Sequence, residues 1–263
     1  LGIFLYNGAL AVTTYHWDDK SAVQNNPAVQ HPSSFQQILE TFNTRFLPGL
    51  SFRLNVKLLG RNIFGFRLVN WLIHILASVA VYSLASVTLS ALKLKGHSLT
   101  KHGDLLPILA GLLFLAHPVQ TETVNLITQR FTSLGALFYV TAVYLYAAAR
   151  IKNSKPLYGL SLIVTVGAMF SKEFCFTIPL AMILYEFLFI NGPEYRRANR
   201  WALMIPFLCT LPIIPLLLLK PVAAMTPTAR IAKTASTHEE QAPSFLSRLD
   251  RISRTETEIS RKD

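Results

Sequence analysis

Apolar residues in this chain come in long blocks, without the period of two or 3.6 that marks half-buried strands and helices. Blocks of this kind indicate membrane-spanning helices rather than the core of a soluble domain. The pattern predicts an all-α membrane protein with about seven transmembrane helices, at residues 1–13, 66–92, 105–116, 131–149, 157–170, 174–190 and 201–219. The chain begins with Leu1 and its first block is short, so we expect the first helix to be truncated.

Polar stretches lie outside these blocks. In the first, residues 14–64, we expect a short helix at 34–40 with Ser34 at its N-terminus. An amphipathic helix at 50–59 is expected to lie along the membrane surface. We therefore divide the chain into a transmembrane domain, 1–220, and a non-cytoplasmic polar segment, 221–263, that leads to a further C-terminal part.

Composition and charge agree with a membrane protein. Hydrophobic residues make up 51% of the chain and charged residues 15%, where soluble domains carry about a quarter. The net charge of +11 would suggest nucleic acid as a partner of a soluble protein. Here, however, many cations lie in three short connections: Lys93, Lys95, Lys101; Arg150, Lys152, Lys155; and Arg196, Arg197, Arg200. Such loops are typically cytoplasmic, so we expect membrane lipid and no nucleic acid as a partner.

If the basic connections are cytoplasmic, the acidic motifs share the opposite face. The third and fifth blocks are also short, about 12 and 14 residues, and would rise about 18–21 Å against a hydrocarbon core of roughly 30 Å. We therefore expect the motifs that follow them to lie below the membrane surface and to face a water-filled cavity. Such a cavity suits a substrate with a lipid tail and a polar head.

Two acidic positions and a histidine follow the first block. Asp18 or Asp19 could act as a general base on an acceptor hydroxyl, and a solvated loop pair or a helix cap is the alternative. His16 leaves a divalent metal open, although one histidine and two aspartates are a poor ligand set. Farther along, His117 and Glu122 flank a break at Pro118. They would either line the site or belong to a structural linker.

Cations at block ends are the remaining candidates. Lys172, next to Glu173, and Arg130 could bind a lipid phosphate, and snorkelling toward headgroups is the alternative. Asn70 and His74 share a helix face, which favours hydrogen bonds between helices.

The motifs together resemble one family. They are Trp-Asp-Asp at 17–19, His-Pro-Val-Gln-Thr-Glu at 117–122, Gln-Arg-Phe-Thr-Ser-Leu at 129–134, and Ser-Lys-Glu at 171–173 followed by a Tyr-Glu-Phe-Leu-Phe run. This order is similar to the membrane portion of the GT-C-type glycosyltransferases called TMTC proteins and of their bacterial relatives with tetratricopeptide repeats. The similarity covers nearly all of residues 1–220, and Gln129-Arg130 and Tyr185-Glu186 are closer to the bacterial branch.

The resemblance implies a hexosyltransferase that moves a sugar from a polyprenyl- or dolichyl-phosphate donor to a protein Ser or Thr hydroxyl, with inversion. Animal members use a mannose donor. One of Asp18 and Asp19 would be catalytic, Lys172 and Arg130 would hold the donor phosphate, and His117, Glu122 and Glu173 would line the site.

The resemblance also bears on location and completeness. It implies the bacterial inner membrane, or alternatively the endoplasmic reticulum membrane, with a non-cytoplasmic active face. Relatives continue into further spans and helical repeats, and no 34-residue repeat is visible here. We therefore expect the acceptor-binding part to be absent, so that this fragment could be inactive alone. A transporter or flippase for lipid-linked sugars, or a non-catalytic membrane scaffold, is the alternative.

Overall fold

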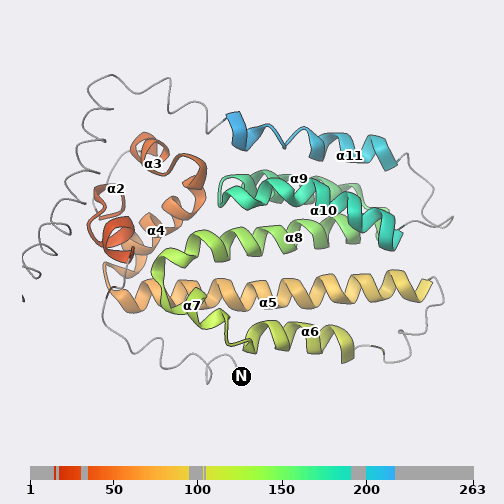
Figure 1. The fold of residues 1–263 in the computed structure, drawn as a ribbon, viewed down its shortest axis with the longest axis horizontal. Helices are drawn as coiled ribbons and strands as arrows, with labels where there is room; N and C mark the ends of the chain where they lie inside the picture. Colours follow the sequence, from red (N-terminus) through yellow and green to blue (C-terminus); the bar gives the residue numbers. More distant parts are fainter. Residues whose placement is uncertain are drawn as a thin grey trace, which may run out of the picture. The chain divides into compact units, whose positions relative to one another are not determined.

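The computed structural model describes residues 15, 18–30, 35–94, 103, 105–190 and 200–216, which belong to a unit spanning Leu1–Leu217. All regular elements in these ranges are helices (Figure 1), which confirms the all-α fold class. In chain order they are η1 (Lys20–Gln24), α2 (Pro27–Gln30), α3 (Phe35–Phe42), η2 (Asn43–Arg45), α4 (Phe46–Leu59), α5 (Ile63–Leu94), α6 (Leu105–Ala116), α7 (Gln120–Asn125), η4 (Ile127–Gln129), α8 (Arg130–Lys152), α9 (Lys155–Met169), η5 (Glu173–Thr177), α10 (Ile178–Tyr185), η6 (Glu186–Ile190) and α11 (Arg200–Leu208).

Three of the helical stretches are long and apolar enough to cross a membrane. They are Ile63–Leu92, Ile127–Lys152 and Glu173–Ile190, and three shorter apolar helices are Leu105–Ala116, Lys155–Met169 and Trp201–Leu216. The predicted count of seven spans is therefore not confirmed. The expected first span, 1–13, and the polar segment 221–263 lie outside the described residues.

The two short predicted helices are short in the structure as well. Helix α6 has the predicted bounds, with 12 residues, and α9 has 15 residues. At 1.5 Å per residue they rise about 18 and 22 Å, less than the thickness of a hydrocarbon core. Helix α6 ends directly before His117-Pro118, and α9 ends two residues before Ser171.

Helix α8 occupies the centre of the arrangement, between α5 on one side and α9 and α10 on the other (Figure 1). Its buried residues form one apolar cluster with residues of α9, α10 and α11. Polar contacts between neighbouring helices add to this packing, because Ser161 Oγ donates to the Ala142 carbonyl at 2.8 Å and Ser78 Oγ to the Gly111 carbonyl at 2.8 Å. Such contacts hold helices together where the surrounding lipid supplies no hydrophobic driving force.

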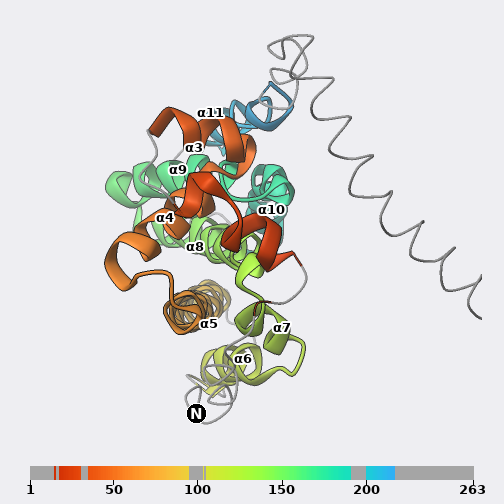
Figure 2. The same ribbon diagram turned by 90° about the vertical axis from the view of Figure 1, so that its left-hand side faces the viewer.

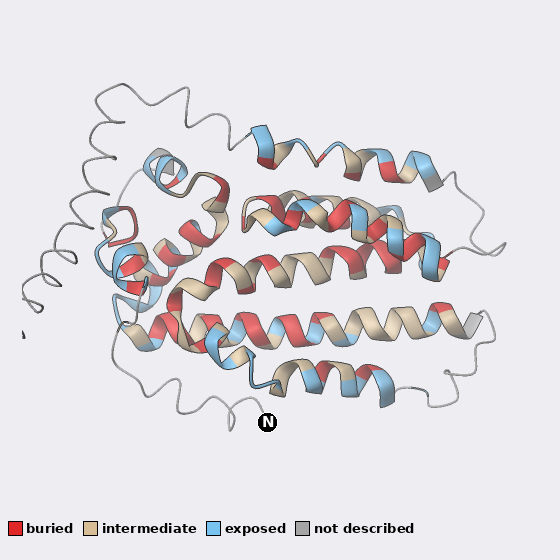
Figure 3. Cartoon of the chain, in the orientation of Figure 1, coloured by how far each residue is buried: buried red, intermediate tan, exposed pale blue. Residues whose placement is uncertain are grey.

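Exposed apolar side chains mark the surfaces that fit a lipid environment. Helix α6 exposes leucines and an isoleucine along its length (Figure 3), whereas α8 is largely buried or half-buried. Helix α4 exposes Leu50, Leu54 and Leu58 on one face and buries Phe52 and Asn55. A helix is confirmed at the predicted place, although it begins four residues earlier than expected; its position along the membrane surface stays a prediction.

The short helices of the first polar stretch gather at one end of the helix bundle. Helices α2, α3 and α4 lie beside the first residues of α5 and α8 and the turn between α9 and α10 (Figures 1 and 2). The helix ends that border the three basic connections lie at the opposite end (Figure 1). This separation agrees with the prediction that the motifs share one face of the protein and the basic connections the other.

Candidate functional site

An apolar cluster anchors the first polar stretch onto the helix bundle. Its buried members come from four separate parts of the chain: Val23, Val29, Phe52, Phe66, Ile127 and Phe131. Because Val23 belongs to η1 and Ile127 to η4, the cluster holds these two short helices together. The aspartates that precede η1 are thereby brought to the residues that precede α8.

Asp19 is buried and hydrogen-bonded at this junction. Its carboxylate accepts the backbone N–H of Ile127 at 3.2 Å, the N–H of Thr128 at 2.8 Å and the Thr128 hydroxyl at 2.9 Å. The first N–H groups of a helix have no partner within it, and an aspartate oxygen is a favourable acceptor for them. Asp19 therefore caps η4 from a distant part of the chain, and its lone pairs are committed to the fold.

Asp18 lies in the opposite environment. It is exposed, and its backbone carbonyl accepts bonds from Ala22 N and Ser21 Oγ. Its carboxylate has no hydrogen bond to any residue that the structure describes. The neighbouring Tyr15 has a raised pKa because its hydroxyl is partly buried and because the negative charge of Asp19 disfavours the tyrosinate. Of the two aspartates, Asp18 is the one whose carboxylate is exposed and not hydrogen-bonded to a described residue.

Glu173 is held by the first polar stretch. Arg45 donates from Nε and Nη2 to its two carboxylate oxygens at 2.8 and 3.2 Å, and Thr44 Oγ1 donates to Oε1 at 3.2 Å. The Leu47 N–H donates to the Phe170 carbonyl at 3.0 Å, which fixes the same two segments by their backbones. Glu173 thus lies near the predicted site, but its charge is neutralised by Arg45.

Lys172 follows the end of α9 and keeps its charge unpaired within the described ranges. It is half-buried, and its pKa is lowered by burial and by the positive charge of Arg45, which the carboxylate of Glu173 opposes. A Cβ built on Gly135 would lie 3.1 Å from the Lys172 Cβ, so Lys172 lies against α8. Gly135 is five residues after Arg130, about 8 Å along the helix. The structure thus places Lys172 and Asp19 near the same end of α8.

Arg130 lies in the protein interior, whereas the sequence suggested a position in contact with the donor phosphate. It is wholly buried, and it donates to Asn70 Oδ1 at 2.7 Å, Asn55 Oδ1 at 3.0 Å and the Phe66 carbonyl at 2.7 Å. The guanidinium also lies over the Phe52 ring, with its Cζ 4.4 Å from the centroid. These contacts give Arg130 a structural role inside the protein, although its Nη1 has no hydrogen-bond partner among the described residues; the predicted contact with a donor phosphate stays a prediction.

The partners of Arg130 include a residue that the sequence already singled out. Asn70 accepts from Arg130 and donates from Nδ2 to the Leu126 carbonyl at 3.0 Å, and His74 Nε2 contacts the Leu115 carbonyl at 3.2 Å. The prediction that Asn70 and His74 form hydrogen bonds between helices is confirmed.

His117 and Glu122 lie in the connection between α6 and α8. Both are exposed: His117 Nδ1 accepts the Val119 N–H at 3.3 Å, and Glu122 Oε1 accepts Gln129 Nε2 at 3.1 Å. Among the described residues, no hydrogen bond or ion pair joins them to Asp18 or Lys172. Glu122 supports η4 through Gln129, on the same short helix that Asp19 caps.

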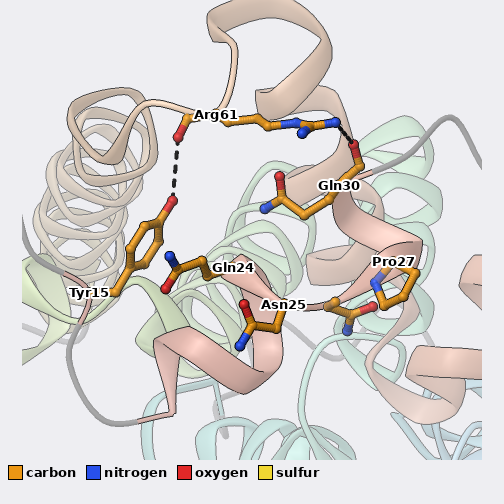
Figure 4. A pocket seen from close by; sticks show the side chains of 7 residues that line it. Tyr15, Gln24, Asn25, Pro27, Gln30 and Arg61 are labelled. Atoms are coloured by element: carbon orange, nitrogen blue, oxygen red, sulfur yellow. Dashed lines mark hydrogen bonds between the residues drawn. The ribbon is translucent and has the colours of Figure 1, made fainter.

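A polar cavity of about 520 Å³ is formed by residues that lie before and after Asp18 and Asp19 in the chain, together with Arg61 (Figure 4). It is lined by Tyr15, Gln24, Asn25, Asn26, Pro27, Gln30 and Arg61. Carboxamides in a loop have no periodic pattern, which is why the sequence did not reveal it. In the described part of the chain, no three His, Cys, Asp or Glu side chains are grouped as metal ligands would be, and His16 lies outside that part.

Comparisons with known proteins confirm the resemblance to the TMTC family. The chain is 28% identical over 183 residues to the protein O-mannosyl-transferase F38B6.6 of Caenorhabditis elegans, covering 64% of this chain and 24% of that protein. It is 31% identical over 148 residues to TMTC4 of Mus musculus (51% and 20%) and 25% identical over 203 residues to Tmtc3 of Drosophila melanogaster (66% and 22%), both named protein O-mannosyl-transferases. The chain thus spans a fifth to a quarter of the length of these relatives. No family model and no solved structure matches it.

Proposed function

We propose that this chain is the membrane portion of a glycosyltransferase that moves a sugar from a polyprenyl-phosphate donor to a Ser or Thr hydroxyl of a protein. The relatives named above support transfer to protein, since their names describe protein O-mannosyl-transferases. The observation that carries the proposal is an exposed carboxylate, Asp18, near the same end of α8 as Lys172, a lysine without an ion-pair partner among the described residues.

Asp18 is the proposed general base. Its carboxylate takes the proton of the acceptor hydroxyl as the hydroxyl oxygen attacks the anomeric carbon of the sugar. The bond between the anomeric carbon and the phosphate oxygen breaks from the opposite side, so the configuration inverts and the polyprenyl phosphate leaves. Asp19 is a positioning residue, because its three hydrogen bonds hold the turn that presents Asp18.

Lys172 is the proposed partner of the leaving phosphate. Burial and a nearby arginine lower the pKa of Lys172 and so disfavour its charged form. A bound anion would stabilise that charged form. Since Arg45 pairs with Glu173, that glutamate does not compete strongly for Lys172. Stabilising charge on the departing phosphate lowers the barrier to transfer.

The proposal is tested by replacing each aspartate with asparagine in the full-length protein. We expect Asp18→Asn to lower turnover by at least about 100-fold, the usual contribution of a general base, without a change in melting temperature. Asp19→Asn should lower the melting temperature, since one N–H of η4 would face an amide N–H₂ in place of a carboxylate oxygen. Transfer of labelled sugar from a polyprenyl phosphate to a Ser/Thr peptide is the assay.

Lys20→Gln is the matched control, because Lys20 is exposed, lies two residues after Asp18 and has no proposed role. If Asp18→Asn keeps the turnover of the unmodified protein, Asp18 is not the base. A flippase for lipid-linked sugars would instead move the donor across vesicle membranes equally well with and without the Asp18 carboxylate, and would yield no glycopeptide.

A further inference from the structure

The polar cavity beside the aspartates has no role in the chemistry above. Its lining surrounds the aspartates in the chain, because Tyr15 precedes Asp18 and Gln24 to Asn26 follow it. Asp19 directly precedes η1 and Gln24 is its last residue, so the two are separated by no more than about 8 Å along its axis. The Tyr15 hydroxyl also feels the negative charge of Asp19, which places this side of the cavity close to the segment that carries the proposed base.

The cavity offers both hydrogen-bond donors and acceptors and no carboxylate. Gln24 and Asn25 are exposed, and their side chains form no hydrogen bond with any other described residue. Asn26 uses its Oδ1 for the Ala28 N–H at 3.0 Å, and Gln30 uses its Nε2 for the Val23 carbonyl at 2.7 Å. Among the described residues, the Nδ2 of Asn26 and the Oε1 of Gln30 have no hydrogen-bond partner, so the lining residues offer both amide N–H₂ groups and carbonyls.

Arg61 and Tyr15 form the rim. Arg61 Nη2 donates to the Gln30 carbonyl at 2.7 Å, and the Tyr15 hydroxyl donates to the Arg61 carbonyl at 3.4 Å (Figure 4). These bonds join the segment before Asp18 to α2 and to the residues after α4. The rim is thus cross-linked by the fold itself, as expected of a preformed binding site.

We propose that this cavity binds an uncharged polar stretch of the acceptor polypeptide next to the Ser or Thr that receives the sugar. Carboxamides match peptide units, each of which presents one N–H and one carbonyl. Tyr15 and Gln24, which line the cavity, flank the base in the chain, and no residue of the Lys172 segment lines it, so the cavity suits the acceptor better than the donor phosphate. This inference rests on the proposed function. It also places part of the acceptor site inside this chain.

The test measures binding separately from transfer. The probe is a fluorescein-labelled decapeptide of Thr, Ser, Val and Gly, and its anisotropy is followed with the full-length protein in detergent. We expect Gln24→Ala and Asn25→Ala each to raise the peptide Kd about 3- to 10-fold, as the loss of one hydrogen bond does, without a change in melting temperature. Lys20→Ala, on the same short helix but outside the cavity, should leave the Kd unchanged.

Several outcomes would overturn the inference. They are the absence of measurable peptide binding, equal affinity in all three variants, and displacement of the peptide by methyl α-mannoside, which would make the cavity a sugar site. Because Asp18→Asn removes the base without touching the cavity, this variant should bind the peptide normally. Cavity-dependent binding without any sugar transfer would therefore refute the proposed function and leave the peptide site standing.

Discussion

Replacing Arg130 with lysine separates a structural role from the phosphate-binding role that the sequence suggested. Arg130 donates three hydrogen bonds to buried acceptors, on Asn70, Asn55 and Phe66, and lies over the ring of Phe52. A lysine ammonium is a compact point charge and cannot reach acceptors arranged around a planar fork. The variant Arg130→Lys therefore keeps the charge but breaks the geometry.

The expected cost follows from the number of acceptors left unpaired. If the lysine reaches one of the three, two buried acceptors lose their donor at about 1–3 kcal/mol each, and the weaker contact with the Phe52 ring adds up to about 1 kcal/mol. We expect a loss of about 2–7 kcal/mol in the free energy of unfolding. For a chain of this size that corresponds to roughly 4–28 °C in melting temperature.

The assay is thermal unfolding in detergent, followed by donor binding at 4 °C, where the variant is still folded. Arg53→Lys is the matched control, because Arg53 lies half-buried on α4 and forms no contact with Arg130 that the structure records. We expect the control to change stability by less than about 0.5 kcal/mol. The reasoning is refuted if Arg130→Lys keeps the melting temperature of the unmodified protein and weakens donor binding about tenfold or more.

Three further predictions concern the same bundle. Because burial and Arg45 lower the pKa of Lys172, this lysine loses its proton at a lower pH than a free lysine. Donor affinity should therefore fall as the pH rises into the alkaline range. Titrations of donor binding against pH should show this loss at higher pH in Lys172→Arg. Gly135→Ala would place a Cβ 3.1 Å from the Lys172 Cβ and 3.2 Å from Phe174 Cζ, so we expect about 1–3 kcal/mol of destabilisation and weaker donor binding; unchanged binding and melting would contradict this packing. Glu186→Gln breaks a buried ion pair with Arg150 at 2.6 Å and should cost about 3–5 kcal/mol, measured by melting temperature, whereas a neutral result would mean that the pair does not stabilise the fold.

Much of the fold could be predicted from the sequence because the helices follow local rules. The apolar block at 105–116 predicted α6 with its bounds, since His117-Pro118 cannot continue the helix. The block at 131–149 predicted α8 to within three residues. Asn153, which caps the C-terminal end of α8, has a left-handed conformation (φ 49°), and asparagine is a residue type suited to that position. The number of spans was less certain, because short apolar helices do not reveal by themselves whether they cross a membrane.

The candidate site could be predicted only in part. Asp18, Asp19 and Lys172 were named from the sequence, and the structure brings their segments near one end of α8. The cavity was not predicted, because its carboxamides have neither a period nor a charge to mark them.

By itself, the sequence determined which segments become apolar helices and where the polar motifs interrupt them, because both follow from neighbouring residues. Only the tertiary structure decided which charged groups are free. Asp18 and Asp19 are identical and adjacent, yet Asp19 is bonded to residues more than one hundred positions away. Arg130 and Lys172 both border apolar segments, yet one is buried among the amides of Asn55 and Asn70 and the other has no ion-pair partner in the part described. Burial and hydrogen bonding decide whether a charged side chain can contact a substrate, and the residues that bury or bond it come from distant parts of the chain.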